Sequence, residues 1–445
     1  LFISPEGLCE EGLVSMNDIT ARVLPSAREA DFAAAELCRR GLLSLAWENF
    51  NAQPESFAEL RRDFECFRAE ESRWLRDYAL FSVLKEKNGG RCWTEWPREF
   101  SARVTEALAA FAAENGDGIS FVEFTQFIFY RQLAALASYC AERGVTLMGD
   151  LPIYVAWDSA DVWSAPALFD LDQDGMPRCV AGVPPDYFSE TGQLWGNPHY
   201  AWREHEKTGF AWWLSRIQKN LQDVDILRID HFRGFSACWE VAFGAENARG
   251  GKWASAPGEA FFTLLKEKLG SPLPLIAEDL GIITDEVAAL RDFAGLPGMR
   301  ILQFAFGQGK NNPYLPHCYD KNTVVYTGTH DNDTTNGWYQ AATEQEKDHY
   351  RRYLNVDGSN AAWDFIRLAL SSPADTAILP LQDVLSLGTE HRMNIPGTTR
   401  GNWGFTFSFD WWQEGFSEGL RYLSALFGRN EQAEKAAEET DEFLR

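Results

Sequence analysis

The chain of 445 residues is long enough to bury a large core, either as several domains or as one barrel with insertions. Its 41 basic and 65 acidic residues give a net charge of −24, which would repel nucleic acid and anionic membrane surfaces. No stretch of the sequence is apolar over the roughly 18 residues that a membrane span needs. A neutral substrate therefore suits the chain better than a polyanion or a membrane.

The cysteines indicate a reducing compartment. Eight of them are scattered along the chain without a C-x-x-C pair or a compact framework. This pattern predicts a cytoplasmic protein. The 17 tryptophans are distinctive, because flat apolar rings stack on the C–H faces of sugars, although most of them are expected in the core.

The first third of the chain is helical in character. From about Asp31 to Glu142, apolar side chains recur at spacings of three and four residues, as at Phe64, Phe67, Trp74 and Tyr78. We therefore predict a mainly helical insertion over residues 1–145.

After residue 145 the pattern changes to short apolar runs, each followed by a carboxylate or a polar loop. Six such runs alternate with longer helical or irregular stretches, which is typical of parallel βα units. The runs are Thr146–Asp150, Asp225–Asp230, Pro274–Glu278, Met299–Phe306, Thr323–Thr327 and Ala377–Gln382.

These runs predict an α/β fold, a (β/α)8 TIM barrel with inserted subdomains. A closed barrel needs eight strands, so residues 146–445 would supply strands three to eight. Strands one and two are then missing from this chain, and the roughly 60 residues that carry them would precede Leu1.

The segment 157–221 is too long for an ordinary crossover and is rich in Asp, Gly, Pro and Trp. We predict an insertion over the barrel mouth that shapes the substrate site. Within it, Asp170–Gly175 begins like a calcium-binding EF-hand loop, but position twelve is Ala181 instead of glutamate. We interpret these acids as a polar turn, with a weaker calcium site of another kind as the alternative.

Two charged side chains at the end of the second run can meet. Arg228 and Asp230 are two residues apart on a strand, so they point to the same face. At the C-terminal end of a barrel strand, the guanidinium would lower the pKa of the acid and keep it ionised, as a nucleophile must be. A structural ion pair or a helix cap explains this motif, taken alone, about as well.

The third run ends in two acids, Glu278 and Asp279. Asp279 suits the N-cap of a following helix, which leaves Glu278 at the strand tip among apolar neighbours. There desolvation would raise the pKa of Glu278 and keep a proton on it for donation, as a general acid requires. The alternative is a capped strand end without a catalytic role.

A further run ends in His330, Asp331 and Asp333. Glycosidic cleavage needs an acid, a nucleophile and further polar groups that hold the sugar, so three acidic strand tips in succession favour that chemistry. A metal site at His330 is disfavoured, because the chain has no H-E-x-x-H and no second histidine at ligand spacing. Asp150 at the end of the first run extends the set, with a cap or a turn as its alternative role.

Taken together, these segments resemble the amylomaltase or disproportionating-enzyme family of 4-α-glucanotransferases, relatives of the α-amylases. The resemblance covers essentially the whole chain. It is carried by Gly149–Ala156, Asp158–Trp163, Gly182–Pro198, Arg228–Gly234, Ile276–Gly281, Tyr326–Thr334 and Met393–Thr398. The sequence departs from the family at Gly401–Phe405, where Asn-Trp would be followed by a more basic and aromatic pair.

The resemblance implies a role for each acidic tip. Asp230 would be the nucleophile that forms a covalent glucosyl-enzyme, Glu278 the acid/base and Asp331 the acid that stabilises the transition state. Supporting residues would bind the sugar at the cleavage point and tune the nucleophile. They are Asp150, Arg228 and His330.

The resemblance also implies a lid. Tyr187 and Phe188 resemble the flexible lid of the family over the acceptor side, with Trp195 and Asn197 nearby. Such a lid suits transfer, because excluding water lets an acceptor hydroxyl reach the intermediate first. The family uses no organic cofactor and no catalytic metal.

The leading hypothesis is a retaining transferase that acts on malto-oligosaccharides and α-1,4-glucans, with neither nucleic acid nor membrane as a partner. An α-amylase-type retaining hydrolase is the nearest alternative, because the same acids serve both reactions and only the incoming nucleophile differs. A truncated, inactive glucan-binding chain is the third hypothesis. The loop Gly182–Pro198 favours transfer.

Overall fold

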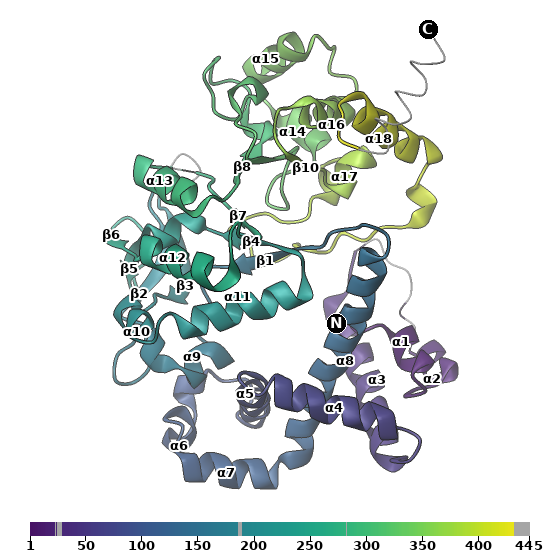
Figure 1. Cartoon of the computed structure of the whole chain (residues 1–445), viewed down its shortest axis with the longest axis vertical. Helices are drawn as coiled ribbons and strands as arrows, with labels where there is room; N and C mark the ends of the chain where they lie inside the picture. The colour runs from purple at the N-terminus through teal and green to yellow at the C-terminus, as the bar shows by residue number, and fades with distance from the viewer. Residues whose placement is uncertain (23, 25–28, 186–188, 282, 431–445) are drawn as a thin grey trace. The chain divides into compact units, whose positions relative to one another are not determined.

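The computed structural model describes residues 1–22, 24, 29–185, 189–281 and 283–430 (Figure 1). The chain forms two compact units, which are described one at a time. The first comprises Leu1–Ser26, Phe32–Leu275 and Thr284–Ala294, and the second comprises Ala27–Asp31, Ile276–Ile283 and Gly295–Arg445. None of the helices in these described ranges is long and apolar enough to cross a membrane.

The first unit begins with helices that gather around the long helix α8, against which α3, α4, α5 and α7 pack (Figure 1). They are α1 (Pro5–Glu10), α2 (Met16–Thr20), α3 (Phe32–Ala52), α4 (Ala58–Glu70), α5 (Leu75–Lys87), α6 (Arg98–Ser101), α7 (Thr105–Glu114) and α8 (Gly116–Ala141). Local signals set some of their ends: Ser15 and Asp18 form a capping box at the start of α2.

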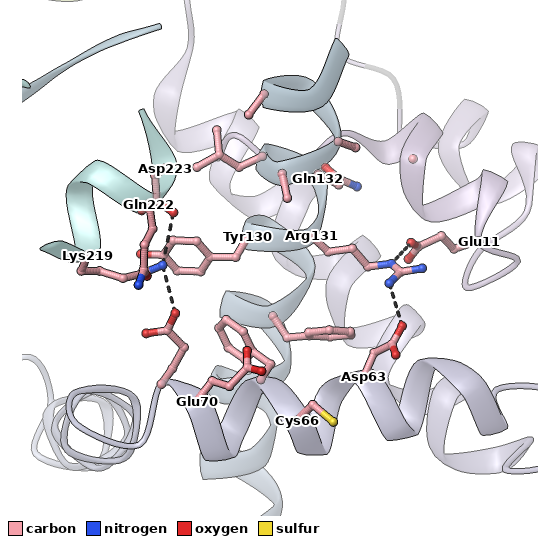
Figure 2. Close-up of a pocket in the computed structure, with 18 of the residues that line it drawn as sticks. Glu11, Asp63, Cys66, Glu70, Tyr130, Arg131, Gln132, Lys219, Gln222 and Asp223 are labelled. Carbon is pink, nitrogen blue, oxygen red and sulfur yellow. Dashed lines mark hydrogen bonds and ion pairs between the residues drawn. The ribbon is translucent and has the colours of Figure 1, made fainter. Parts of the chain in front are cut away.

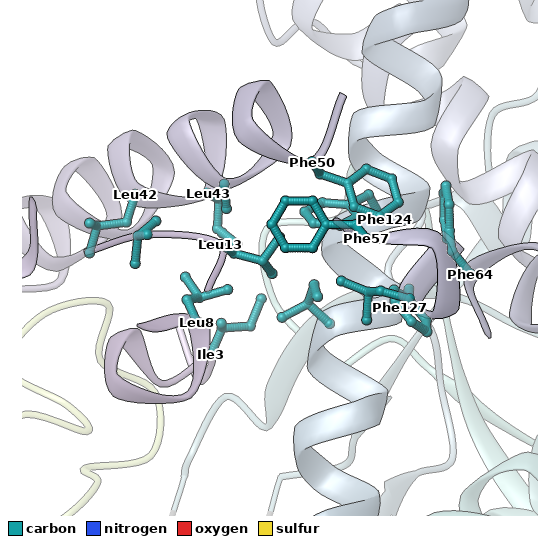
Figure 3. Close-up of a cluster of buried hydrophobic side chains, with 14 of the residues drawn as sticks. Ile3, Leu8, Leu13, Leu42, Leu43, Phe50, Phe57, Phe64, Phe124 and Phe127 are labelled. Carbon is teal, nitrogen blue, oxygen red and sulfur yellow. The ribbon is translucent and has the colours of Figure 1, made fainter. Parts of the chain in front are cut away.

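A cluster of phenylalanines joins α3, α4 and α8 (Figure 3). Phe50 of α3, Phe64 of α4, and Phe124 and Phe127 of α8 are each at most 4% exposed. The ring centroids of Phe50 and Phe124 lie 4.9 Å apart, and those of Phe64 and Phe127 lie 5.5 Å apart. The apolar spacing in the sequence therefore places one face of each helix in a shared core, where each buried phenylalanine contributes roughly 2–3 kcal/mol.

A three-stranded sheet has the order β1-β4-β7, and of its strand β7 only Leu275 belongs to the first unit. The strands are β1 (Met148–Pro152), β4 (Ile226–Asp230) and β7 (Leu275–Ala277). β1 and β4 are parallel and in a register that sets Asp150 opposite Arg228. Helix α11 (Ala211–Asp223) packs against both β4 and α8, and so links this sheet to the helices.

A second, antiparallel sheet in the first unit has the order β3-β2-β5-β6. Its strands are β2 (Cys179–Val183), β3 (Gln193–Pro198), β5 (Ala237–Ala242) and β6 (Lys252–Ser255). This sheet is not among the predicted strands. The remaining helices of the unit are α9 (Ala160–Ser164), α10 (Trp202–Lys207), α12 (Gly258–Leu269) and α13 (Asp285–Ala294).

The second unit holds a parallel sheet with the order β10-β9-β8. Its strands are β8 (Gly298–Ile301), β9 (Thr323–Tyr326) and β10 (Thr376–Ile378). Its helices are α14 (Thr335–Ala341), α15 (Glu344–Leu354), α16 (Ala361–Ser371), α17 (Leu381–Val384) and α18 (Glu414–Leu426). Phe306, Tyr350 and Phe365 lie at the centre of the core and are each at most 3% exposed.

Each of the six apolar runs overlaps a strand, and the fourth and sixth runs differ most from the strands in the structure. In the fourth run only Met299–Ile301 belongs to the strand, β8, and Leu302–Phe304 is a 3-10 helix. In the sixth run the strand ends at Ile378, because Pro380 caps helix α17 and has no N–H to offer a sheet.

Candidate active site

One guanidinium joins two of the predicted carboxylates in the first unit. Arg228 Nη1 donates to Asp150 Oδ1 at 2.7 Å and to Oδ2 at 2.8 Å, and Arg228 Nη2 donates to Asp230 Oδ1 at 2.9 Å. The side chain of Arg228 is 10% exposed, whereas those of Asp150 and Asp230 are 49% and 43% exposed. The buried cation therefore holds two accessible acids, and the prediction that Arg228 and Asp230 meet is confirmed.

Asp150 lies within β1 and not at its end, because the strand continues to Pro152. The cap or turn role considered for it therefore does not apply. Its place opposite Arg228 on the neighbouring parallel strand explains the bidentate contact.

Aromatic rings surround the residue that follows Asp230. His231 adopts a left-handed conformation with a φ of 51°, and its ring lies 4.8 Å from Trp195 and 6.4 Å from Tyr154. Burial and the nearby Arg233 lower the pKa of His231 to about 3, so the imidazole is neutral at pH 7. Asn197 donates its amide to Val155 O at 2.9 Å.

Tyr187 and Phe188, the predicted lid residues, lie outside the described residues. The segment that follows them is anchored: Ser189 Oγ donates to Gly192 O at 2.7 Å. Gly192 has a φ of 68°, and a Cβ there would lie 2.4 Å from Val183 O. This turn therefore requires glycine.

Glu278 and Asp279 follow β7 and belong to the second unit. Glu278 is partly buried, and its Oε1 accepts the Leu280 N–H at 2.9 Å. Asp279 is 3% exposed and accepts the Met299 N–H at 2.6 Å, with Arg300 Nη1 3.4 Å away. The predicted N-cap role of Asp279 is wrong: the next helix, α13, begins only at Asp285, and the carboxylate binds the backbone of β8 instead.

The tip of β9 presents His330 and Asp331, with His330 Nε2 3.5 Å from Asp331 Oδ2. Residues from a segment that is distant in the sequence, 392–403, contact both side chains. Asn394 Nδ2 donates to Asp331 Oδ1 at 2.6 Å, and Arg392 Nη2 donates to Asp331 O at 2.7 Å. The Trp403 ring lies 5.2 Å from that of His330, at an interplanar angle of 32°.

Sequence reasoning missed these three supporting residues. Two stretches noted only in comparison with the family contain two of them: Met393–Thr398 contains Asn394, and Gly401–Phe405 contains Trp403. The structure thus brings Asp150, Arg228 and Asp230 together in the first unit, and places His330 and Asp331 together in the second.

The Asp170–Gly175 segment is a turn, as interpreted from the sequence. Asp172 Oδ1 accepts the backbone N–H groups of Asp174 and Met176, each at 2.9 Å. Within the described ranges, no three His, Cys, Asp or Glu side chains are grouped so that they could hold a metal ion.

A cavity of about 720 Å³ lies elsewhere in the first unit, between α4, α8 and α11 (Figure 2). Lys219 pairs there with Glu71 at 3.0 Å and with Asp223 at 3.2 Å, and its ammonium lies 3.8 Å from the Tyr130 ring centroid. Arg131 makes two ion pairs of its own. None of the predicted site residues lines this cavity, so its charges connect helices and do not belong to the candidate site.

Comparisons with known proteins find a matching family and similar relatives. A family model described as 4-alpha-glucanotransferase matches residues 1–411. A 4-alpha-glucanotransferase of Synechocystis sp. is 44% identical over 96% of this chain and 85% of its own length. One of Thermus thermophilus is 46% identical over 89% of this chain and 80% of its own.

A solved structure is similar as well. It is titled as an amylomaltase from Streptococcus agalactiae in complex with acarbose. The likeness has a TM-score of 0.92 at 36% identity, and it covers 96% of this chain and 86% of the other.

Proposed function

Since this chain belongs to the 4-α-glucanotransferase family of transglycosylating enzymes, we propose that it moves α-1,4-glucan segments between malto-oligosaccharides by a retaining double displacement with Asp230 as the nucleophile. The observation that carries this proposal is the three-bond contact of Arg228 with Asp150 and Asp230. A nucleophilic carboxylate must be ionised and accessible, and a buried cation beside a 43% exposed acid supplies both conditions.

In the first step Glu278 gives its proton to the glycosidic oxygen while Asp230 Oδ bonds to the anomeric carbon. The C1–O bond breaks, and the shorter glucan leaves with a free 4-hydroxyl. In the second step the 4-hydroxyl of an acceptor glucan attacks the same carbon, its proton passes to Glu278, and the bond to Asp230 breaks. The configuration at the anomeric carbon is thereby retained.

Asp331 and His330 bind the sugar at the cleavage point in this scheme, and Asp331 stabilises the developing positive charge of the transition state. Support comes from the bond of Asn394 to Asp331 and from the Trp403 ring beside His330. On the acceptor side we assign Trp195 and Asn197, with Tyr187 and Phe188 as the lid that excludes water. The exposed Trp195 ring offers a flat apolar face to a sugar.

We also propose that the six parallel strands are strands three to eight of a (β/α)8 barrel, with residues 1–145 as a helical insertion before them and 157–221 over its mouth. Ala277 N donates to Pro297 O at 3.0 Å, which connects β7 to the start of β8. A crystal structure with a bound glucan tests this arrangement. The carboxyl groups of Asp230 and Glu278 should lie about 5 Å apart, and a separation of roughly 7–9 Å would point to inversion.

A reducing compartment, and hence the cytoplasm, is proposed from the cysteines, all eight of which are free. Thiol titration of protein isolated under rapid alkylation should find eight free thiols. Recovery of disulfide-linked peptides would contradict it.

Product analysis of maltotriose tests the reaction. Transfer predicts free glucose together with a series of longer malto-oligosaccharides, and Asp230→Asn should form neither. A second candidate, the α-amylase-type hydrolase, uses the same acids but predicts short sugars without longer products. Accumulation of reducing ends without chain elongation would therefore contradict the transferase.

A further inference from the structure

One buried carboxylate holds both ends of the loop that carries His330 and Asp331. Asp383, in α17, is 1% exposed. Its Oδ2 accepts from Thr327 Oγ1 at 2.5 Å and from Thr335 Oγ1 at 2.7 Å, and its Oδ1 accepts the Thr335 N–H at 2.7 Å. Thr327 is the residue after β9 and Thr335 is the first residue of α14, so these bonds close the whole loop 328–334.

The three hydrogen bonds to Asp383 are strong because they are buried and because their acceptor is a carboxylate. Thr327 and Thr335 are both fully buried, and hydrogen bonds to an ionised acceptor are roughly twice as strong as neutral ones. All three groups donate, which suits a carboxylate without a proton of its own. A buried carboxylate that lost these partners would be costly, so the loop ends cannot separate without a large penalty.

The middle of the loop is fixed as well. Gln303 Nε2 donates to Asp333 O at 2.8 Å, and Thr329 donates to Asn332 Oδ1 through both its backbone N–H and its hydroxyl at 2.9 Å. By contrast, the side chains of His330 and Asp331 remain 34% and 47% exposed. The loop is therefore a fixed support that presents two accessible groups.

We infer that Asp383 is a positioning residue for the transfer reaction: through Thr327 and Thr335 it fixes where Asp331 stands relative to the reacting sugar. The inference rests on the proposed role of Asp331 at the transition state. Asp383 has no contact of its own with substrate in this account, because it is buried behind the loop. Its effect should fall on kcat more than on KM, since a displaced Asp331 weakens transition-state stabilisation first.

A matched control separates positioning from stability. Asp364 accepts the Tyr350 hydroxyl at 2.6 Å in the same unit and contacts neither end of the loop. Asp364→Asn and Asp383→Asn both replace a hydroxyl-accepting carboxylate with an amide. Thr335→Val adds a milder change, because it removes one hydroxyl bond to Asp383 and leaves the backbone bond in place.

The experiment measures kcat and KM on maltotriose, and the thermal midpoint, for these variants and Asp383→Ala. Asp383→Ala should lower kcat about 100-fold, as expected for a reacting group displaced by about 1 Å. Asp383→Asn should recover part of this loss, Thr335→Val should lower kcat less, and KM should change little. Asp364→Asn should lower the thermal midpoint while kcat stays near that of the parent chain.

Two results would overturn the inference. One is an equal loss of kcat in Asp383→Asn and Asp364→Asn, and the other is a Thr335→Val variant that loses thermal stability but no kcat. Asp331→Asn, measured beside them, keeps the proposed function separate. If Asp331→Asn remains fully active, the role of Asp331 is wrong; if Asp331→Asn is inactive and the Asp383 variants match the control, only the positioning role is wrong.

Discussion

At the scale of single residues, Arg228 is the group on which two acids depend. It donates three hydrogen bonds from a side chain that is only 10% exposed. Sequence spacing predicted the contact with Asp230, because residues two apart on a strand share a face. The contact with Asp150 needed the strand register, which no local pattern reveals.

The first prediction concerns Arg228→Met. Without the guanidinium, Asp230 loses the cation that favours its ionised form and should need a higher pH to ionise. We expect kcat/KM at pH 7 to fall about 100-fold or more and the acid limb of the pH–rate profile to move to higher pH. The exposed pair of Arg178 and Asp170 offers the control Arg178→Met, which should change neither. An unmoved acid limb in Arg228→Met would contradict the tuning role.

Other residues show why local patterns fail. Asp279 looked like a helix cap because it follows an apolar run, yet its partner is Met299, which only the folding of β8 brings close. Asn394 lies 63 residues from Asp331, and nothing in its neighbourhood indicates a polar contact. Asp383 was missed for the same reason, since Thr327 and Thr335 lie 56 and 48 residues away.

The second prediction concerns Asn394→Ala. It removes the 2.6 Å bond to Asp331 Oδ1 and leaves that carboxylate free to turn. We expect kcat to fall roughly 10-fold, because reorientation of a stabilising charge is costly in the transition state, and the thermal midpoint to change little, because Asp331 is exposed and Asn394 is only partly buried. The exposed amide of Asn336, which donates to Ser386 O, gives the control Asn336→Ala. Equal kcat in the two variants would argue against this role.

At the scale of elements, the phenylalanine cluster of α3, α4 and α8 makes the third prediction. Phe124 is fully buried, and its ring centroid lies 4.9 Å from Phe50 and 6.0 Å from Phe64. Phe124→Ala should lower the free energy of unfolding of the first unit by about 3–5 kcal/mol, through lost burial and the cavity left behind. Leu37→Ala, at a residue that is 76% exposed, should cost little. Urea unfolding followed by tryptophan fluorescence measures both, and similar values would contradict the core assignment.

Lys219→Met makes the fourth prediction. It leaves Glu71 and Asp223 without the cation that lies between them, while α4 and α11 stay packed near α8 (Figure 2). We expect a destabilisation of about 2 kcal/mol at pH 7. The destabilisation should be smaller at pH 5, where protonation of Asp223 relieves its repulsion with Glu71. The exposed Lys268→Met is the control. A destabilisation that does not depend on pH would point to lost packing alone.

The parallel strands were the most predictable elements. Every apolar run that precedes a polar tip overlaps a strand, and β7 and β9, which are buried along their whole length, fit the pattern of a strand covered on both faces. The antiparallel sheet was not predicted, because β2, β3 and β5 carry Gly, Trp and Glu between their apolar residues and resemble a loop. Propensity alone does not identify a sheet that is held by pairing.

At the scale of the whole molecule, acid sensitivity should begin in the first unit, which contains His199, His205 and His231. Burial lowers the pKa of all three, to about 4 for His205 and about 3 for His231. In the unfolded chain these groups titrate near pH 6.5, so the unfolded state binds more protons below that pH. Above about pH 6.5 the three histidines therefore do not reduce the free energy of unfolding. As the pH falls below that value, protonation in the unfolded state lowers the free energy of unfolding.

The fifth prediction follows from the lowered pKa values of these histidines. His205→Gln keeps a donor for Leu168 O but removes the titration. The free energy of unfolding should fall by about 1 kcal/mol less per pH unit between pH 6 and 5 in the variant than in the parent chain. Comparing the two proteins isolates His205 from buried acids such as Asp383, whose pKa burial raises. Parallel pH dependences would contradict the assignment.

The most direct test of the central claim is a mass measurement of the glycosyl-enzyme. In Glu278→Gln, a maltotriosyl fluoride can still react, because fluoride leaves without a proton, but the second step lacks its base. The intact mass should rise by one maltotriosyl group, and peptide mapping should place this group on Asp230. A modified peptide that lacks Asp230 would contradict the nucleophile assignment, and so would an equal mass increase in the Asp230→Asn, Glu278→Gln double variant.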